Sequence, residues 1–271
     1  EGNGIPADGD LWVSYSVNKE DMWISRIPVP VEINASAHAD DDFSNNKSIA
    51  ELTDWNIYSP VWAPVSLEDQ WLKLQDKDPF DYAKVERKIP ASKELKVSFD
   101  LKAGQNNKGT LQIEFLDENG IACSRIELTD DGIFRLKGGS RFANMMKYEA
   151  GKIYHVEAVL STVDRNIQVY VDGKRVGLRM FYAPVAAVER IVFRTGVPRT
   201  FPTVDTPADQ TYDLPNAGAQ DPLAEYGIAN VKTSSTDKDA SSAFLTYADL
   251  SHYADYFNGM EDENIVQAIP N

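Results

Sequence analysis

The chain of 271 residues has one cysteine, three histidines and no long apolar run. A single cysteine, Cys123, excludes an internal disulfide framework and a zinc cluster built on thiolates. The histidines are far apart in sequence, and no two of them have the spacing of a metal-binding pair. The phosphate-binding glycine loops and the G-x-S-x-G nucleophile motif are also missing, so nucleotide chemistry and serine nucleophiles have no support. No segment approaches the roughly 18 apolar residues that cross a bilayer, and we expect no membrane insertion.

Positive charge is also scarce. The chain has 27 Lys and Arg residues against 42 Asp and Glu, a formal net charge of -15. Nucleic acids and anionic membrane surfaces both require a basic footprint, so neither is an expected partner. The overall charge instead favours solubility and a neutral or cationic ligand.

Short alternating segments are abundant. Apolar residues at every second position, as in Leu95, Val97, Phe99 and Leu101, predict strands with one face in a core. Hairpin turn signals separate these segments: Glu118-Asn119-Gly120, Asp130-Asp131-Gly132 and Asp172-Gly173. We therefore predict an all-β fold, a two-sheet antiparallel jelly-roll sandwich with an N-terminal hairpin and one short C-terminal helix.

The two ends differ from the middle. Residues 8–30 read as a β-hairpin that is too small to be stable alone, and residues 247–260 have the i, i+3, i+4 spacing of a helix. We predict three parts: a hairpin at 1–30 left from a preceding domain, a sandwich at 31–235, and a linker with a short helix at 236–271 that leads to a following domain.

The middle of the chain resembles a known family. An Asp41–Ser44 segment, Trp55 and Trp71–Leu74 are followed by adjacent strands at 154–157 and 167–174 that end in an Asp-Gly hairpin. This pattern resembles the concanavalin A-like (LamG or jelly-roll) sandwiches attached to glycoside hydrolases. The resemblance covers residues 40–196 and implies fold more directly than function.

The ends carry a second resemblance. Residues 9–21 resemble the closing blade of a sialidase-like β-propeller, and residues 256–267 are similar to the lead-in to a helical glycosidase domain. Together these resemblances imply a module of a large bacterial glycoside hydrolase that acts on polysaccharides. They also imply a secreted, periplasmic or cell-surface location, and catalytic carboxylates that lie elsewhere in the parent protein.

Sugar-binding surfaces combine exposed aromatic rings with charged side chains that reach hydroxyl groups. Trp62 lies between two prolines in a predicted loop and Tyr82 is close by in sequence, while Glu114, Arg125 and Glu127 fall on the polar side of alternating strands. We name Trp62, Tyr82, Glu114, Arg125 and Glu127 as candidate carbohydrate-binding residues on an exposed sheet face. The alternative is that such a face serves solubility and cross-strand pairing.

Acidic residues suggest two further kinds of site. Asp40, Asp41 and Asp42 are candidate ligands of a structural Ca²⁺, although three adjacent aspartates cannot all reach one ion. No other cofactor is required. The segment Glu114–Glu118 superficially resembles the acid cluster of jelly-roll glucanases, but its acids do not alternate along one face of a strand, so we assign no catalytic residue.

Three hypotheses follow. The first is a non-catalytic binding or spacer module that sits between catalytic domains of a parent enzyme, holds them in place and contributes to glycan contact. Its partners are a glycan or neighbouring domains of the same chain. The second is an autonomous carbohydrate-binding module with an aromatic platform around Trp62 or Tyr82. The third is a jelly-roll glycosidase or polysaccharide lyase, which requires two acids about 5 to 10 Å apart in a groove. For this chain alone we lean against enzymatic activity.

Overall fold

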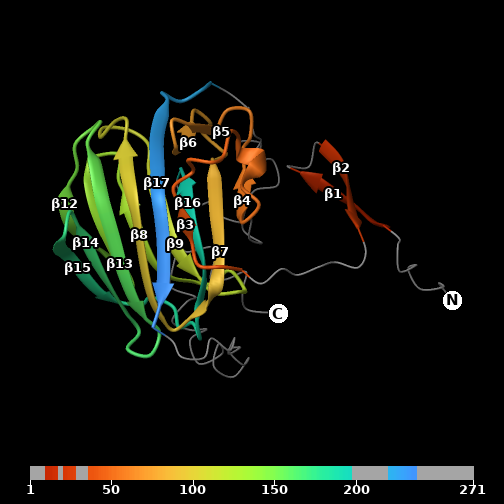
Figure 1. Ribbon diagram of the computed structural model, residues 1–271. Coiled ribbons are helices and arrows are strands. Elements are labelled where there is room, and N and C mark those ends of the chain that lie inside the picture. The colour runs from red at the N-terminus through yellow and green to blue at the C-terminus, as the bar shows by residue number, and fades with distance from the viewer. Residues whose placement is uncertain (1–9, 18–20, 29–35, 197–218, 237–271) are drawn as a thin grey trace, which may run out of the picture.

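The computed structural model describes residues 10–17, 21–28, 36–196 and 219–236. Two large antiparallel sheets pack face to face in this part of the chain, and a separate hairpin forms a third, two-stranded sheet (Figure 1). The one helical element within the described ranges is a single 3-10 turn, η1 (Ile49–Glu51). The predicted all-β sandwich is therefore confirmed. The predicted helix at 247–260 lies outside the described residues.

The seven-stranded sheet has the order β12-β11-β10-β9-β16-β7-β4. Its strands are β4 (Trp55–Tyr58), β7 (Lys84–Ser92), β9 (Leu111–Leu116), β10 (Ala122–Leu128), β11 (Ile133–Gly138), β12 (Arg141–Lys147) and β16 (Val188–Thr195).

The eight-stranded sheet has the order β15-β14-β13-β8-β17-β6-β5, and the short β3 also pairs with β17. Its strands are β3 (Asp40–Asp41), β5 (Val65–Glu68), β6 (Trp71–Asp76), β8 (Glu94–Ala103), β13 (Ile153–Ser161), β14 (Asn166–Val171), β15 (Lys174–Met180) and β17 (Ala224–Ser235).

The core lies between the two sheets. Every second residue of β8, from Leu95 to Ala103, is at most 2% exposed, as the alternating pattern predicts. Phe99 of β8 meets Phe193 of β16 edge to face, with ring centroids 5.0 Å apart, and this contact joins the two layers. The turn glycines Gly120, Gly132 and Gly173 all have positive φ, which confirms the three hairpin signals in the sequence.

One charged group crosses the core. Arg87 of β7 is 2% exposed, and its Nε donates to Asp41 Oδ2 of the opposite sheet at 2.7 Å. The same carboxylate oxygen accepts from Trp55 Nε1 at 3.0 Å. Asp41 thus gives the buried Arg87 guanidinium an ionic partner, and a buried cation would be costly to leave without one.

The N-terminal hairpin consists of β1 (Asp10–Val17) and β2 (Asp21–Pro28) in antiparallel register. Trp12 and Ile24 lie on one face of this ribbon because Trp12 pairs with Arg26 and Ser14 pairs with Ile24. Their side chains are 63% and 68% exposed. Two strands with an exposed apolar face need a further partner for stability.

Three strands were not predicted from the sequence: β5, β12 and β15. All three are edge strands. β12 and β15 each contain a register shift, which interrupts the two-residue period that identifies strands from sequence. The edges at β12 and β15 lie together at one end of the sandwich, on the left in Figure 1.

Candidate functional site: the polar face of the seven-stranded sheet

The seven-stranded sheet directs its polar side chains away from the core. The pairing register aligns Lys137, Arg125 and Glu114 in one row across β11, β10 and β9. The next row contains Arg135, Glu127, Gln112, Arg194 and Tyr58. We call this surface, formed by the two rows, the polar face. The sequence correctly placed Glu114, Arg125 and Glu127 on one side of the sheet.

The expectation that this face is exposed is wrong. Glu114 and Arg125 are each 2% exposed and Glu127 is 4% exposed. The alternating pattern identified their common side but could not show whether that side meets water, because burial depends on the rest of the fold. Whether these residues contact a sugar remains a prediction.

Glu114 is held by two arginines. Arg125 Nε donates to Glu114 Oε1 at 2.9 Å, and Arg125 Nη2 donates to the same oxygen. Arg194 Nη2 lies 3.5 Å from that oxygen. Burial raises the pKa of Glu114, but the guanidinium groups of Arg125 and Arg194 outweigh burial and lower the pKa to about 2. Glu114 is therefore ionised at neutral pH and cannot donate a proton.

The other carboxylates on the polar face are paired as well. Glu127 accepts a hydrogen bond from Arg135 Nη2. Glu86 Oε2 lies 2.9 Å from Lys84 Nζ. Burial raises the pKa of Glu86, but Lys84 and Arg190 outweigh it and lower the pKa below its ordinary value.

Two polar atoms near the centre of this face have no hydrogen-bond partner among the described residues. They are Gln112 Oε1, on a side chain that is 1% exposed, and Arg194 Nη2, whose 3.5 Å contact with Glu114 is an ion pair without hydrogen-bond geometry. Buried polar groups are nearly always hydrogen-bonded, so unsatisfied atoms call for a partner that supplies a donor and an acceptor. A hydroxyl group offers both.

Aromatic rings lie at one end of the polar face. Tyr58 and Tyr82 are half-buried, and their ring centroids are 5.5 Å apart. The Arg194 guanidinium carbon lies 5.3 Å from the Tyr82 ring centroid. Arg194 therefore joins the Tyr58–Tyr82 pair to Glu114. Sequence reasoning missed Arg194, although the alternation of Arg190, Val192 and Arg194 in β16 could have indicated it.

Trp62 lies in the loop between β4 and β5 and is half-buried. Its carbonyl oxygen accepts from the Lys77 amide at 2.9 Å, which ties this loop to the segment that leads to Tyr82. The structure thus brings the loop of Trp62 near that segment. Glu114, Arg125 and Glu127 share one sheet, and Tyr82 lies just before β7 of that sheet.

The three adjacent aspartates have separate partners. Asp40 pairs with Lys232 at 2.8 Å, Asp41 with Arg87, and Asp42 accepts from the Ser44 amide and hydroxyl. Within the described ranges, no three His, Cys, Asp or Glu side chains form a group that could hold a metal ion. In the same part of the chain, no helix is long and apolar enough to span a bilayer.

Comparison with known proteins adds the family. The family described as "Sialidase-like, CBM domain", where CBM denotes a carbohydrate-binding module, matches residues 55–210. A solved structure named "Sialidase" is 88% identical with a TM-score of 0.77; the match covers 97% of this chain and 24% of that one. The chain thus spans about a quarter of that sialidase. No curated protein sequence matches the chain.

Two more distant structures share the fold alone. One, the apo Crh5 transglycosylase, is 13% identical with a TM-score of 0.52 over 80% of this chain and 89% of that one. The other, from work on endo-acting O-glycanases that initiate mucin breakdown, is 12% identical with a TM-score of 0.50 over 73% and 98%. The resemblance to sandwich modules of glycoside hydrolases is confirmed, as is the role of a non-catalytic, carbohydrate-associated module. The chain belongs to the family of sialidase-like carbohydrate-binding modules.

Proposed function

We propose that this module binds a glycan at the end of the polar face where Tyr58 and Tyr82 lie beside Arg194. The observation that carries the proposal is the half-buried Tyr58–Tyr82 pair with the Arg194 guanidinium beside it. A pyranose ring can stack on tyrosine through its C–H face, and the Arg194 guanidinium lies beside the Tyr82 ring. Trp62, Glu114, Arg125 and Glu127 remain candidate contacts around this position.

The Glu114 carboxylate is suited to binding rather than to hydrolysis. A glycosidase requires a carboxylic acid whose pKa is raised toward neutrality, so that it can protonate the leaving oxygen. The Glu114 pKa of about 2 is the reverse of that requirement. Glu114 acts instead as a fixed anion that orients the guanidinium groups of Arg125 and Arg194. This pairing sets the direction in which their remaining N–H groups point.

Calorimetric titration with mucin-type and plant oligosaccharides tests the site. We expect Tyr82→Ala to weaken binding by about tenfold, since loss of one aromatic contact removes about 1 kcal/mol or more. Trp62→Ala in the same assay shows whether the neighbouring loop contributes. The matched control is Tyr170→Ala, because Tyr170 is a half-buried tyrosine on the outer face of the other sheet. Equal losses for Tyr82→Ala and Tyr170→Ala would contradict this location, and no binding to any glycan would contradict the function.

We further propose that the parent protein is a sialidase that works outside the cytoplasm and that neighbouring domains of the same chain are partners of this module. The near-identical sialidase, of which this chain covers 24%, supports the proposal. Residues 1–30 and 236–271 would then belong to the neighbours, and the exposed face of Trp12 and Ile24 would pack against the preceding domain. A fragment of residues 31–235 should unfold cooperatively by itself, and failure to fold would contradict these boundaries.

A structural Ca²⁺ at Asp40, Asp41 and Asp42 stays a prediction. An ion at this position would compete with Arg87 for Asp41 and with Lys232 for Asp40. Melting in calcium and in EDTA tests it, because an ion bound to the native state alone raises the melting temperature.

A further inference from the structure

The end of the sandwich formed by β11, β12 and β15 is cationic. These three strands contain seven basic residues and no acidic one: Arg135, Lys137, Arg141, Lys147, Lys174, Arg175 and Arg179. The chain as a whole has 42 acidic and 27 basic residues. Such a local excess of positive charge in an acidic protein sets this end apart from the rest of the molecule.

Most of these cations have no carboxylate partner. Arg135 pairs with Glu127, and Lys137 lies over the Tyr182 ring. The other five have no ion pair with any residue in the described part of the chain, although Arg179 Nη1 donates to the Leu178 carbonyl oxygen at 2.9 Å. A cation needs no partner where water solvates it, but their concentration at one end creates a positive field that attracts anions.

A cleft of about 360 Å³ lies in the middle of this cationic end. Its lining residues come from β11, β12 and β15: Leu136, Ala143, Asn144, Met145, Arg175, Val176, Gly177, Leu178 and Arg179. The lining has an apolar floor and two arginines, and it contains no carboxylate. This volume lies within the range of about 300–1,000 Å³ that small-ligand sites occupy.

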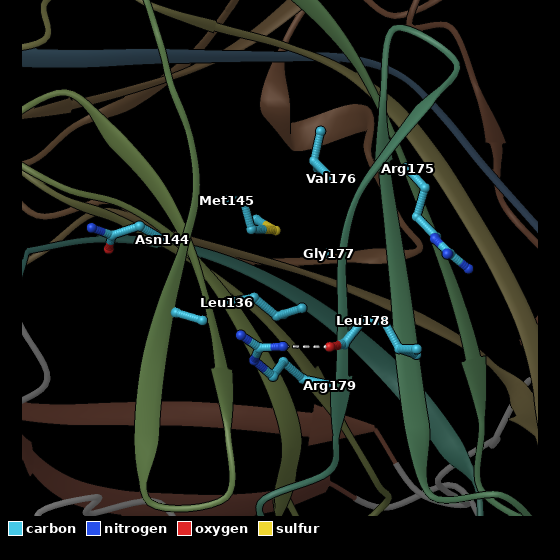
Figure 2. A pocket seen from close by; sticks show the side chains of 9 residues that line it. Leu136, Asn144, Met145, Arg175, Val176, Gly177, Leu178 and Arg179 are labelled. Atoms are coloured by element: carbon cyan, nitrogen blue, oxygen red, sulfur yellow. Dashed lines mark hydrogen bonds between the residues drawn. The ribbon is translucent and has the colours of Figure 1, made fainter.

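Two β-bulges shape the cleft. In β12 the pairing passes from Asn144 to Met146, and in β15 it passes from Arg175 to Gly177. The unpaired residues are therefore Met145 and Val176, and both line the cleft. Bulges re-aim side chains and end regular pairing. Figure 2 shows Met145, Val176 and Leu136 close together, with the Arg179 side chain beside Leu136.

Two glycines make room for these side chains. A Cβ on Gly177 would lie 2.6 Å from Met145 Sδ, and a Cβ on Gly138 would lie 2.7 Å from Arg179 Cβ. Any other residue at either position would displace the neighbouring side chain from the cleft. The positions of Met145 and Arg179 thus depend on the absence of a side chain opposite each of them.

We propose that this cleft binds the negatively charged group of an acidic sugar. Arg179 pairs with the carboxylate or sulfate, Arg175 adds to the positive field, and the partly exposed Met145 and Val176 contact the apolar face of the sugar. A guanidinium group can donate two parallel hydrogen bonds to two oxygens of either a carboxylate or a sulfate. The inference rests on the proposed carbohydrate-binding function, but it concerns a second site away from Tyr82.

An acidic polypeptide is the competing ligand, since β12 and β15 are both edge strands. A peptide that adds to a sheet edge requires a regular row of unpaired N–H and C=O groups. The bulges at Met145 and Val176 interrupt that row on both edges. A compact ligand that enters between the edges fits this geometry better than an added strand.

Three oligosaccharides with one common core test the proposal: lactose, 3′-sialyllactose and 3′-sulfolactose, each titrated into the full 271-residue chain at low salt. We expect at least one charged sugar to bind about tenfold or more tightly than lactose, and the comparison of the two separates carboxylate from sulfate. Arg179→Gln should abolish this preference. The matched control, Lys102→Gln, removes one exposed cation from the outer face of β8 and should keep it.

The outcomes separate the two proposals. If the charged sugars bind no more tightly than lactose, or if Arg179→Gln retains the preference, the cleft is not the site, although glycan binding at Tyr82 stands. If an acidic peptide such as poly-glutamate binds at Arg179 and neither charged sugar does, the cleft serves a polypeptide. If none of the three sugars binds, the acidic-sugar proposal fails. The proposal of glycan binding at the polar face is tested separately, and it fails if the wider oligosaccharide titration also shows no binding that depends on Tyr82. Arg179 is exposed, so its replacement should not unfold the chain.

Discussion

The two outer faces of the sandwich have similar alternating sequences and different environments. On the eight-stranded sheet, Lys96 of β8 pairs with Glu157 of β13 in solvent, with side chains 53% and 26% exposed. On the seven-stranded sheet, Arg125 and Glu114 form the same kind of pair with side chains 3% exposed. Alternation therefore determines which side of a strand is polar, and tertiary packing determines whether that side contacts water.

The energetic consequences differ accordingly. An exposed ion pair contributes little, because water solvates each partner when the other is removed. A buried pair that loses one partner leaves an uncompensated charge in a region of low polarity. Substitutions on the two faces should therefore change the free energy of unfolding by very different amounts.

The largest effect should come from Arg125→Met. Removal of the guanidinium takes away the closest cation of the buried Glu114, and Arg194 lies farther off at 3.5 Å. We expect a loss of about 3–5 kcal/mol in the free energy of unfolding. Urea denaturation followed by tryptophan fluorescence measures it. A loss below about 1 kcal/mol would mean that the polar face is solvated like the outer face of the other sheet.

The next effect is the acid response of Glu114. Because its folded pKa of about 2 lies below the ordinary glutamate value of 4.5, the pair stabilises the fold above about pH 4.5. This contribution, of order 3 kcal/mol, is lost as the pH falls toward 2. Glu114→Gln should remove that part of the pH dependence. Parallel stability curves for the wild type and the variant between pH 5 and 2 would refute the pairing.

Asp76 of β6 provides the opposite case. Burial raises its pKa from 3.8 to about 6, and a hydrogen bond from Thr195 only partly offsets burial. Since the folded state then holds its proton more tightly, stability should fall by about 2 kcal/mol as the pH rises from 4 to 6. Asp76→Asn should flatten this fall. The measurement is the urea midpoint across that range, and an unchanged slope in the variant would assign the effect to other groups.

The smallest effect should come from Lys96→Met on the outer face of β8. Its pair with Glu157 is partly solvated, so we expect a change below about 1 kcal/mol that shrinks further in 1 M salt. The same urea assay compares it directly with Arg125→Met. A loss as large as that of Arg125→Met would remove the distinction between the two faces.

Only part of the candidate binding site could be predicted from the sequence. The alternation of Glu114, Arg125 and Glu127 placed them on one side, and the structure confirms that arrangement. Arg194 belongs beside them through the pairing of β16 with β9, and those strands are more than 70 residues apart. Pairing between distant strands is a property of sheet topology that local patterns do not encode.

The cationic cleft could not be predicted from the sequence at all. The overall charge of -15 favoured neutral or cationic ligands, and the bulges in β12 and β15 concealed both strands. A net charge is a sum over the whole chain and contains no information about where positive charges gather on the surface. The positive end appears only when the two sheet edges are brought together.

The sequence by itself determined the strand pattern, the hairpin turns and the family resemblance, because periodicity and positive-φ glycines are local properties of the chain. Tertiary structure alone decided that Arg125 and Glu114 are buried, that Arg87 crosses to Asp41, and that β12 meets β15. Each of these depends on which segments pack together across long sequence separations, and burial and charge acquire their energetic meaning only from that packing.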